Sequence, residues 1–121
     1  MKYMLLFIKD ETEVLDEAEL KARYADIDVW FAELARDNKL RGGEELQPTS
    51  TATTIRWGDG NPLVTDGPFM ESKETVAGFV TIEASDLDDA IAITKRWPVK
   101  NQTVEIRPVI AHDAMPNHPA G

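Results

Sequence analysis

The chain has 121 residues, 42% of them hydrophobic and 29% charged, which is typical of a single globular domain. The formal net charge of −9 argues against nucleic acid and anionic membranes as partners, because phosphate recognition needs clustered Lys and Arg. Cysteine is absent, which excludes disulfides, thiolate catalysis and thiolate metal sites, and no cofactor is predicted.

The first part of the chain predicts a strand and then a long helix. Residues 3–8 form a short continuous apolar run that suits a central strand buried on both faces. The run is too short for a signal peptide or a membrane span, which favours a cytoplasmic location. Over residues 16–37 one apolar stripe recurs at helical spacing, and it consists of Leu20, Tyr24, Ile27, Phe31 and Leu34. Asn38 is predicted to stop the helix, since it tolerates the left-handed conformation.

The middle of the chain predicts three extended segments. Residues 44–47 lie between a Gly-Gly pair and Pro48, which indicates a short strand. Residues 51–57 are rich in β-branched and aromatic side chains, and residues 62–65 follow after the turn Gly-Asp-Gly-Asn. The two segments predict a β-hairpin.

The last part of the chain predicts a strand and a second helix. Residues 76–84 form the strand, and Ser85 is placed to cap the helix, with Asp88 three residues later. The helix is predicted to end at Pro98.

A final strand is predicted at residues 104–110. Its Pro108 removes one ladder donor and indicates a sheet edge. The prediction is therefore one domain over residues 1–110 and a C-terminal tail over residues 111–121.

Apart from the hairpin, the order of elements is β-α-β-β-α-β, which predicts an α+β, ferredoxin-like fold with an inserted hairpin. Both helices then cover one face of an antiparallel sheet. Because the first strand is apolar on both faces, the second face is expected to pack on another copy in a two-fold homodimer. A ligand site is expected between the sheet and the helices, or where the two subunits meet.

Residues 65–79, TDGPFMESKETVAGF, contain more charge than a connecting loop needs. In a functional interpretation, the stiff turn fixes Asp66, while Glu71 and Lys73 point the same way and Arg56 joins them from the hairpin. In a structural interpretation, Asp66 bonds its own turn, Phe69 packs in the core and the charges are solvated. The sequence leaves both interpretations open.

No metal site is predicted. Both histidines, His112 and His118, lie in the tail, where only Asp113 and Asn117 could add ligands. Trp30, Trp57 and Trp97 are expected to pack in the core, although aromatic rings at a cavity also bind ligands by stacking.

The motif Asp66-Gly67-Pro68-Phe69, followed by Glu71, Lys73 and Glu74, resembles the signature of the YCII-related superfamily, in the branch with the DGPF motif. The resemblance extends over nearly the whole chain, through residues 3–6, 46–48, 52–56 and 104–108. It implies a ferredoxin-like fold that forms a dimeric α+β barrel.

The resemblance also implies two functions. The YCII type includes a lactone dehalogenase and members with a suspected acid-base pair, a His on the first helix and an Asp before a Pro. The DGPF type implies a link to extracytoplasmic-function sigma factors. Here residues 20–30 contain no His, and Trp97 precedes Pro98, so the pair is missing.

The resulting hypothesis is a small cytoplasmic protein that binds a small molecule or a protein partner in a regulatory or accessory role, with a sigma factor as one implied partner. Its predicted ligand-binding residues are Arg56, Asp66, Glu71 and Lys73. The alternative is an acid-base enzyme acting on a small lactone-like metabolite. Asp66 and Glu71 are its candidate catalytic residues, and Lys73 or Arg56 would stabilise an oxyanion.

Overall fold

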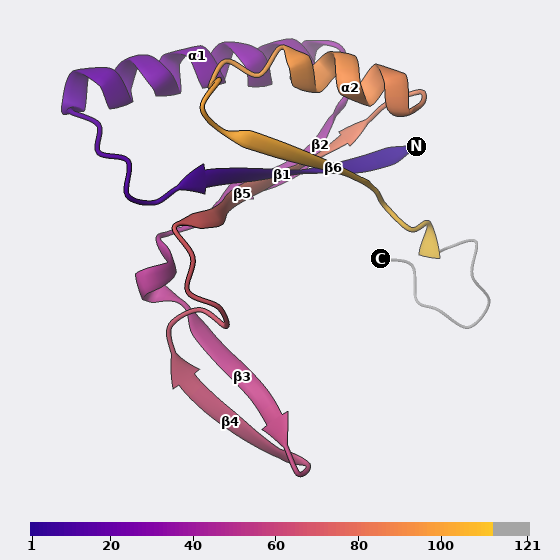
Figure 1. Cartoon of the computed structure of the whole chain (residues 1–121). Coiled ribbons are helices and arrows are strands. Elements are labelled where there is room, and N and C mark those ends of the chain that lie inside the picture. The colour runs from indigo at the N-terminus through magenta and orange to yellow at the C-terminus, as the bar shows by residue number, and fades with distance from the viewer. Residues whose placement is uncertain (113–121) are drawn as a thin grey trace.

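The computed structural model describes residues 1–112 of the chain (Figure 1). It contains two helices, six strands and one short 3-10 turn, in the order β1 (Lys2–Asp10), α1 (Glu17–Arg36), β2 (Leu40–Glu45), η1 (Thr49–Thr51), β3 (Thr53–Gly58), β4 (Asn61–Asp66), β5 (Glu74–Glu83), α2 (Leu87–Lys95) and β6 (Thr103–Pro108). Leaving out β3 and β4, this is the predicted β-α-β-β-α-β order. The α+β, ferredoxin-like prediction is confirmed.

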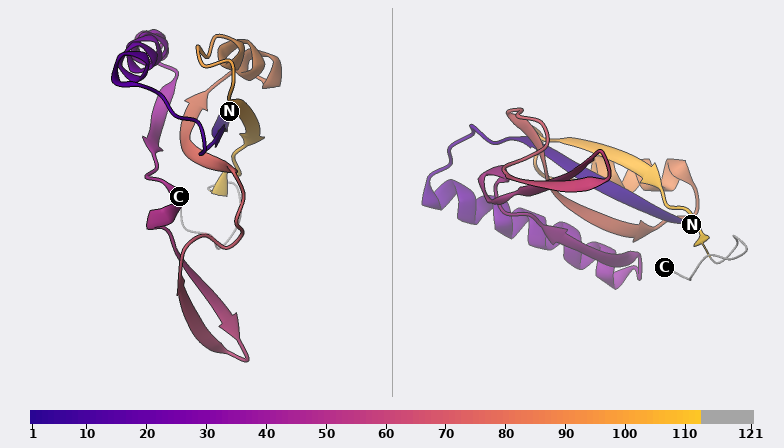
Figure 2. Two further views of the ribbon diagram at one scale, coloured as in Figure 1. Left: turned by 60° about the vertical axis from the view of Figure 1, so that its left-hand side comes forward. Right: turned by 90° about the horizontal axis from the view of Figure 1, so that it is seen from below.

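Four strands form one antiparallel sheet in the order β2-β5-β1-β6. β1 is central, as its apolar sequence predicted, and β6 with its Pro108 lies at an edge. Both helices cover the same face of the sheet (Figure 1). β3 and β4 pair only with each other and project from the opposite side of the sheet (Figure 2).

The core lies between the sheet and the helices. From β1 it takes Tyr3, Leu5 and Phe7, each at most 5% exposed, and from α1 it takes Trp30 and Leu34. The indole of Trp30 donates to the carbonyl oxygen of Ile93 at 3.2 Å, which joins the two helices inside the core. Trp97, beyond α2, completes this aromatic centre.

The other face of β1 carries Met4, Leu6 and Ile8, which alternate with the core residues and are half-buried. The prediction that β1 is buried on both faces is therefore not met within a single chain. The physical reason is that both helices pack on one side, so within residues 1–112 no helix covers the other side of the sheet (Figure 2).

Two local predictions need correction, and the first concerns β2. This strand begins at Leu40 and not at residue 44. Gly42 and Gly43 were expected to break the chain, but they pair with β5 inside the sheet. A β-carbon on Gly43 would lie 2.5 Å from the backbone oxygen of Phe79, so glycine permits this close approach of two strands.

The second correction concerns α2. Its cap is Asp86, whose carboxylate accepts from the backbone nitrogen of Asp89 at 2.8 Å, and not Ser85. Ser85 instead donates to the Asp89 carboxylate through its backbone nitrogen at 2.9 Å. The helix ends at Lys95, three residues before Pro98.

Other turn signals were interpreted correctly. Asn38 has the predicted positive φ, at 55°. No cap was predicted for α1, which the structure shows to be capped by Asp16 in a capping box with Glu19. Asp59 and Gly60 both have positive φ, 51° and 83°, as a two-residue hairpin turn requires. The hairpin strands extend from 53 to 58 and from 61 to 66, close to the predicted bounds.

Candidate functional site

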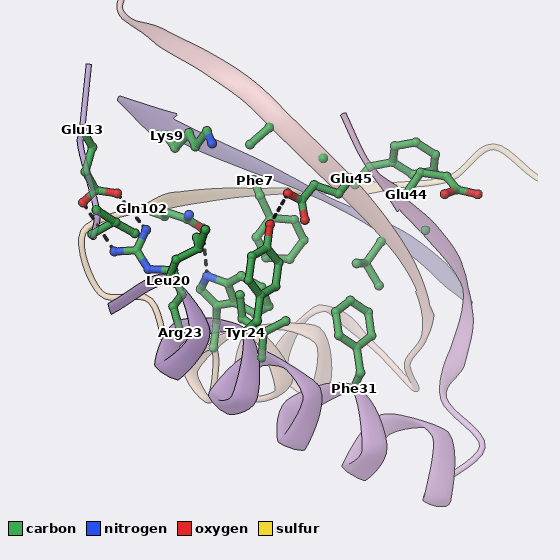
Figure 3. Close-up of a pocket in the computed structure, with 18 of the residues that line it drawn as sticks. Phe7, Lys9, Glu13, Leu20, Arg23, Tyr24, Phe31, Glu44, Glu45 and Gln102 are labelled. Atoms are coloured by element: carbon green, nitrogen blue, oxygen red, sulfur yellow. Dashed lines mark hydrogen bonds and ion pairs between the residues drawn. The ribbon is translucent and has the colours of Figure 1, made fainter. Parts of the chain in front are cut away.

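A cleft of about 470 Å³ opens between α1 and the sheet, beside β1, β5 and the end of β2 (Figure 3). It exists because the first half of α1 stands away from the strands. Leu20 and Tyr24 remain 42% and 41% exposed there, whereas Leu34, near the end of the same stripe, is fully buried. The volume lies in the range of pockets that hold small ligands.

The cleft has an aromatic floor. Phe7 from β1 and Trp97 from beyond α2 have ring centroids 4.3 Å apart, and both line the cleft. Phe31 from α1 adds a third ring, in edge contact with the buried Trp30 at 5.2 Å. The Trp97 indole donates to the Gln102 side chain at 3.2 Å, which fixes the ring at one end of the floor.

A phenol and a carboxylate meet at the mouth of the cleft. Tyr24 from α1 points toward β2, and its hydroxyl donates to Oε1 of Glu45 at 2.5 Å (Figure 3). This hydrogen bond raises the pKa of Tyr24, because the phenolate would face the carboxylate. The phenol therefore stays protonated at neutral pH and Glu45 acts as the acceptor.

A bidentate ion pair closes the other end of the cleft. Arg23 of α1 donates to both carboxylate oxygens of Glu13, at 2.7 and 3.4 Å, and Asn101 donates to the same carboxylate. The hydrogen bond from Arg23 is the main reason that the pKa of Glu13 is lowered. Both side chains are partly buried, with exposed fractions of 20% for Arg23 and 26% for Glu13.

The turn after β1 connects the cleft to the loop that contains Lys73. The Glu11 carboxylate, which lines the cleft, accepts from the backbone nitrogen of Thr49 at 2.9 Å and from its hydroxyl at 2.5 Å. These bonds lower the pKa of Glu11. The backbone nitrogen of Glu11 donates to the carbonyl oxygen of Lys73 at 2.8 Å.

We call β3, β4 and the turn 67–70 the arm. Two hydrogen bonds hold this turn against the start of β3. The backbone nitrogen of Gly67 donates to the carbonyl oxygen of Ala52 at 2.7 Å, and the hydroxyl of Thr54 donates to the carbonyl oxygen of Gly67 at 2.7 Å. Gly67 has φ of 101°, which disfavours any residue with a side chain. Phe69 is 64% exposed and Trp57 is 71% exposed, so the expectation that these two rings pack in the core is wrong for the single chain.

The predicted site residues lie on or beside the arm and outside the cleft lining. Arg56, Asp66, Glu71 and Lys73 are all exposed. Arg56 lies over the ring of Phe69, 5.1 Å from its centroid, and no carboxylate among the described residues forms an ion pair with it. Hydrogen bonds from Thr12 are the main reason that the pKa of Asp10 is lowered, and the nearby charge of Lys73 makes a smaller contribution.

The residues that sequence reasoning missed are Tyr24 and Glu45 as a pair. The sequence predicted Tyr24 only as one member of an apolar stripe and Glu45 only as part of a short strand. The sequence did contain one indication of this pair, which is the Tyr24 hydroxyl inside an otherwise apolar stripe. A buried tyrosine hydroxyl usually has a hydrogen-bond partner, so a partner for Tyr24 could have been expected. Nothing local in the sequence pairs residues 21 positions apart in this way.

Two further expectations concern metal binding and the acid-base pair that the sequence lacks. Among residues 1–112, no three His, Asp or Glu side chains are grouped as a metal site. The tail considered for metal binding includes His118, which lies outside the described residues. Trp97, which stands where the resemblance places an Asp, lines the cleft with an indole.

No helix in the described part of the chain combines the length and apolar character that crossing a membrane requires. The sequence profile of the YCII-related domain matches residues 1–113. An uncharacterised protein of Rhizobium meliloti (strain 1021) is 31% identical over 114 residues, which cover 90% of this chain and 92% of that protein. The chain is thus similar to that relative along almost its whole length.

Proposed function

The chain belongs to the YCII-related domain family, and from this premise we propose that it binds a small molecule in the cleft beneath α1. The observation that carries the proposal is the aromatic floor of Phe7, Phe31 and Trp97 below the Tyr24–Glu45 pair. Ligand pockets generally combine an apolar lining with a few fixed polar groups, and this cleft has both.

The binding role is favoured over acid-base catalysis by the placement of the carboxylates. Asp66 and Glu71, the candidate catalytic residues, are exposed on or beside the arm and do not line the cleft. Within the cleft lining, hydrogen bonds lower the pKa of the carboxyl groups of Asp10, Glu11 and Glu13. A general acid or base working near neutral pH needs a raised carboxylate pKa.

The test is fluorescence titration of the full chain with N-phenyl-1-naphthylamine, an uncharged dye that becomes brighter in apolar pockets. Ile27→Trp fills the cleft from α1, whereas Val29→Trp adds the same ring on a side of α1 where Val29 is 59% exposed. We expect Ile27→Trp to weaken dye binding at least about tenfold, the loss of about 1.4 kcal/mol, and Val29→Trp to leave it unchanged. Equal binding by both variants would contradict the proposal.

A second role, association with a protein, is favoured by the exposed apolar residues of the arm. On one face of the arm, Ile55, Trp57 and Val64 are 49%, 71% and 64% exposed. A two-stranded ribbon is marginally stable alone, so cover by another chain would stabilise it. The arm extends from the same side as the uncovered sheet face with Met4, Leu6 and Ile8 (Figure 2), and we propose that a second copy covers both in a two-fold homodimer.

Sedimentation velocity tests this association. We expect the wild-type chain to sediment as a dimer, Leu6→Glu and Trp57→Glu to shift it toward the monomer, and Val29→Glu to have no effect. A wild-type monomer at all concentrations would remove the homodimer. The regulatory hypothesis would then need a different protein partner. The resemblance implies an extracytoplasmic-function sigma factor, and adding one to the same sedimentation experiment tests whether it binds the chain. Such a partner fits the cytoplasmic location predicted for the chain.

A further inference from the structure

The charges around the cleft are unequally distributed. At the end near β1, the two basic groups Lys9 and Arg23 lie among carboxylates: Arg23 is bound to Glu13, and Lys9 is near enough to Glu11 and Glu13 to lower the pKa of both. On the β2 side, Asp28 and Glu45 line the cleft, and among the described residues neither carboxylate forms an ion pair. The β2 side of the cleft therefore has excess negative charge.

Glu45 is the carboxylate that points to the aromatic rings. Figure 3 shows it reaching toward Tyr24 above Phe7, whereas the neighbouring Glu44 points away from Tyr24. The two side chains leave opposite faces of β2 because successive residues of a strand alternate between its faces. Glu45 pairs with Gly78 of β5, and Glu44 pairs with Phe79. A β-carbon on Gly78 would lie 2.7 Å from the backbone oxygen of Glu44, so this glycine lets β5 and β2 approach closely beside Glu45.

The acceptor capacity of Glu45 is only partly used. An ionised carboxylate can accept about four hydrogen bonds. Among the described residues, the Glu45 side chain accepts one hydrogen bond, from the Tyr24 hydroxyl to Oε1. Because the raised pKa of Tyr24 keeps the proton on the phenol, Tyr24 does not neutralise Glu45 by transferring that proton to the carboxylate. A ligand entering the cleft therefore meets a negative group that still accepts donors.

We propose that the cleft selects small amines, in which an apolar body lies on Phe7, Phe31 and Trp97 and a protonated nitrogen donates to Glu45. This inference rests on the proposed small-molecule function and names its ligand class. The nitrogen would also lie near the face of an aromatic ring, and a cation–π contact adds to the ion pair when both are partly withdrawn from water. Carboxylates and phosphates of similar size are repelled by the same carboxylates.

The test uses three probes of similar shape and different charge: 2-phenylethylamine, 2-phenylethanol and 3-phenylpropionate. Calorimetric titration of the full chain at neutral pH and low salt measures each affinity. We expect the amine to bind about tenfold more tightly than the alcohol, since an exposed ion pair and a cation–π contact together are worth about 1.4 kcal/mol, and we expect no measurable binding of the carboxylate.

Two variants locate the effect, because Glu45→Gln and Glu44→Gln remove the same charge from adjacent residues on opposite faces of β2. We expect Glu45→Gln to abolish the preference for the amine and Glu44→Gln to retain most of it. Equal losses in the two variants would overturn the contact with Glu45, because they would indicate only the general field of the acidic side. Circular dichroism of both variants checks that the fold is intact.

The two proposals can fail separately. If the alcohol binds as tightly as the amine to the wild-type chain, the amine preference is wrong and the small-molecule function stands. The same conclusion follows if no probe binds but N-phenyl-1-naphthylamine still enters the cleft. If the dye also fails to distinguish Ile27→Trp from the wild type, the cleft is not the binding site and both proposals fail.

Discussion

The cleft and the arm both carry large apolar side chains, but these differ in exposure and geometry: Phe7 and Trp97 in the cleft floor are 5% and 8% exposed, whereas Trp57 on the arm is 71% exposed. In the cleft the rings of Phe7, Phe31 and Trp97 are held together by core contacts and form a concave surface. On the arm Trp57 and Val64 lie on a thin ribbon with no layer behind it. A concave apolar surface can enclose a small molecule, whereas a flat, projecting one fits another protein surface.

The largest expected difference between the two regions is in stability, and two tryptophans measure it. Trp30→Ala removes a ring that is 3% exposed and bonded to Ile93, and we expect a loss of about 3–5 kcal/mol in the free energy of unfolding. Trp57→Ala removes a ring that is 71% exposed, and we expect a change within about 0.5 kcal/mol. Urea denaturation at low protein concentration measures both.

A large loss in Trp57→Ala under those conditions would mean that the arm is covered even in the single chain, and the comparison would break down. A loss that grows with protein concentration would instead point to a partner copy, because association then contributes to the measured stability.

Gly67→Ala tests whether the arm is stabilised independently of the cleft. At φ of 101° a side chain costs roughly 1–2 kcal/mol, and we expect faster proteolysis and faster amide exchange in the arm. Dye binding in the cleft should be unchanged. If dye affinity falls together with arm protection, the two regions are coupled through the loop that joins Lys73 to Glu11.

The Glu13–Arg23 pair should stabilise the cleft end in a pH-dependent manner. We expect Glu13→Gln to lower the unfolding free energy by about 1 kcal/mol at neutral pH, since the pair is partly buried. The pKa of Glu13 is lowered from 4.5 in the folded chain, so its contribution is complete above pH 4.5 and is lost as pH falls through the lower folded value.

The measurement is urea denaturation of the wild type and Glu13→Gln over a series of acidic pH values. The two stabilities should approach each other in acid, because protonated Glu13 no longer pairs with Arg23. A constant difference across the series would show that Glu13 stabilises the fold by packing and not by charge.

Arg56→Gln should have a small effect on stability, at most about 1 kcal/mol, because its contact with Phe69 is an exposed cation–π pair. We also expect Arg56→Gln and Lys73→Gln to leave binding in the cleft unchanged. If either weakens binding, the sequence prediction for these residues is supported, and the arm of one copy must reach a ligand in the same or a neighbouring copy.

The sequence was a good guide wherever one local cause decides the structure. The apolar run of β1 predicted a central strand, Asp59-Gly60 predicted the hairpin turn, and Asn38 predicted the end of α1. It misled where glycine has two uses: Gly42 and Gly43 were taken as breaks, yet they allow β2 to approach β5 closely. The tail assigned to residues 111–121 stays a prediction.

What the sequence determined alone is the fold, because strand and helix periodicity and turn residues depend on neighbours a few positions apart. The existence and lining of the cleft depend on the tertiary structure, because they follow from how α1 packs on the sheet. The stripe of α1 predicts which face meets the sheet, but not that Leu20 and Tyr24 stand off while Leu34 is fully buried. The Tyr24–Glu45 hydrogen bond likewise depends on how α1 and β2 pack, since a distance between elements is fixed by the side chains that fill the space between them.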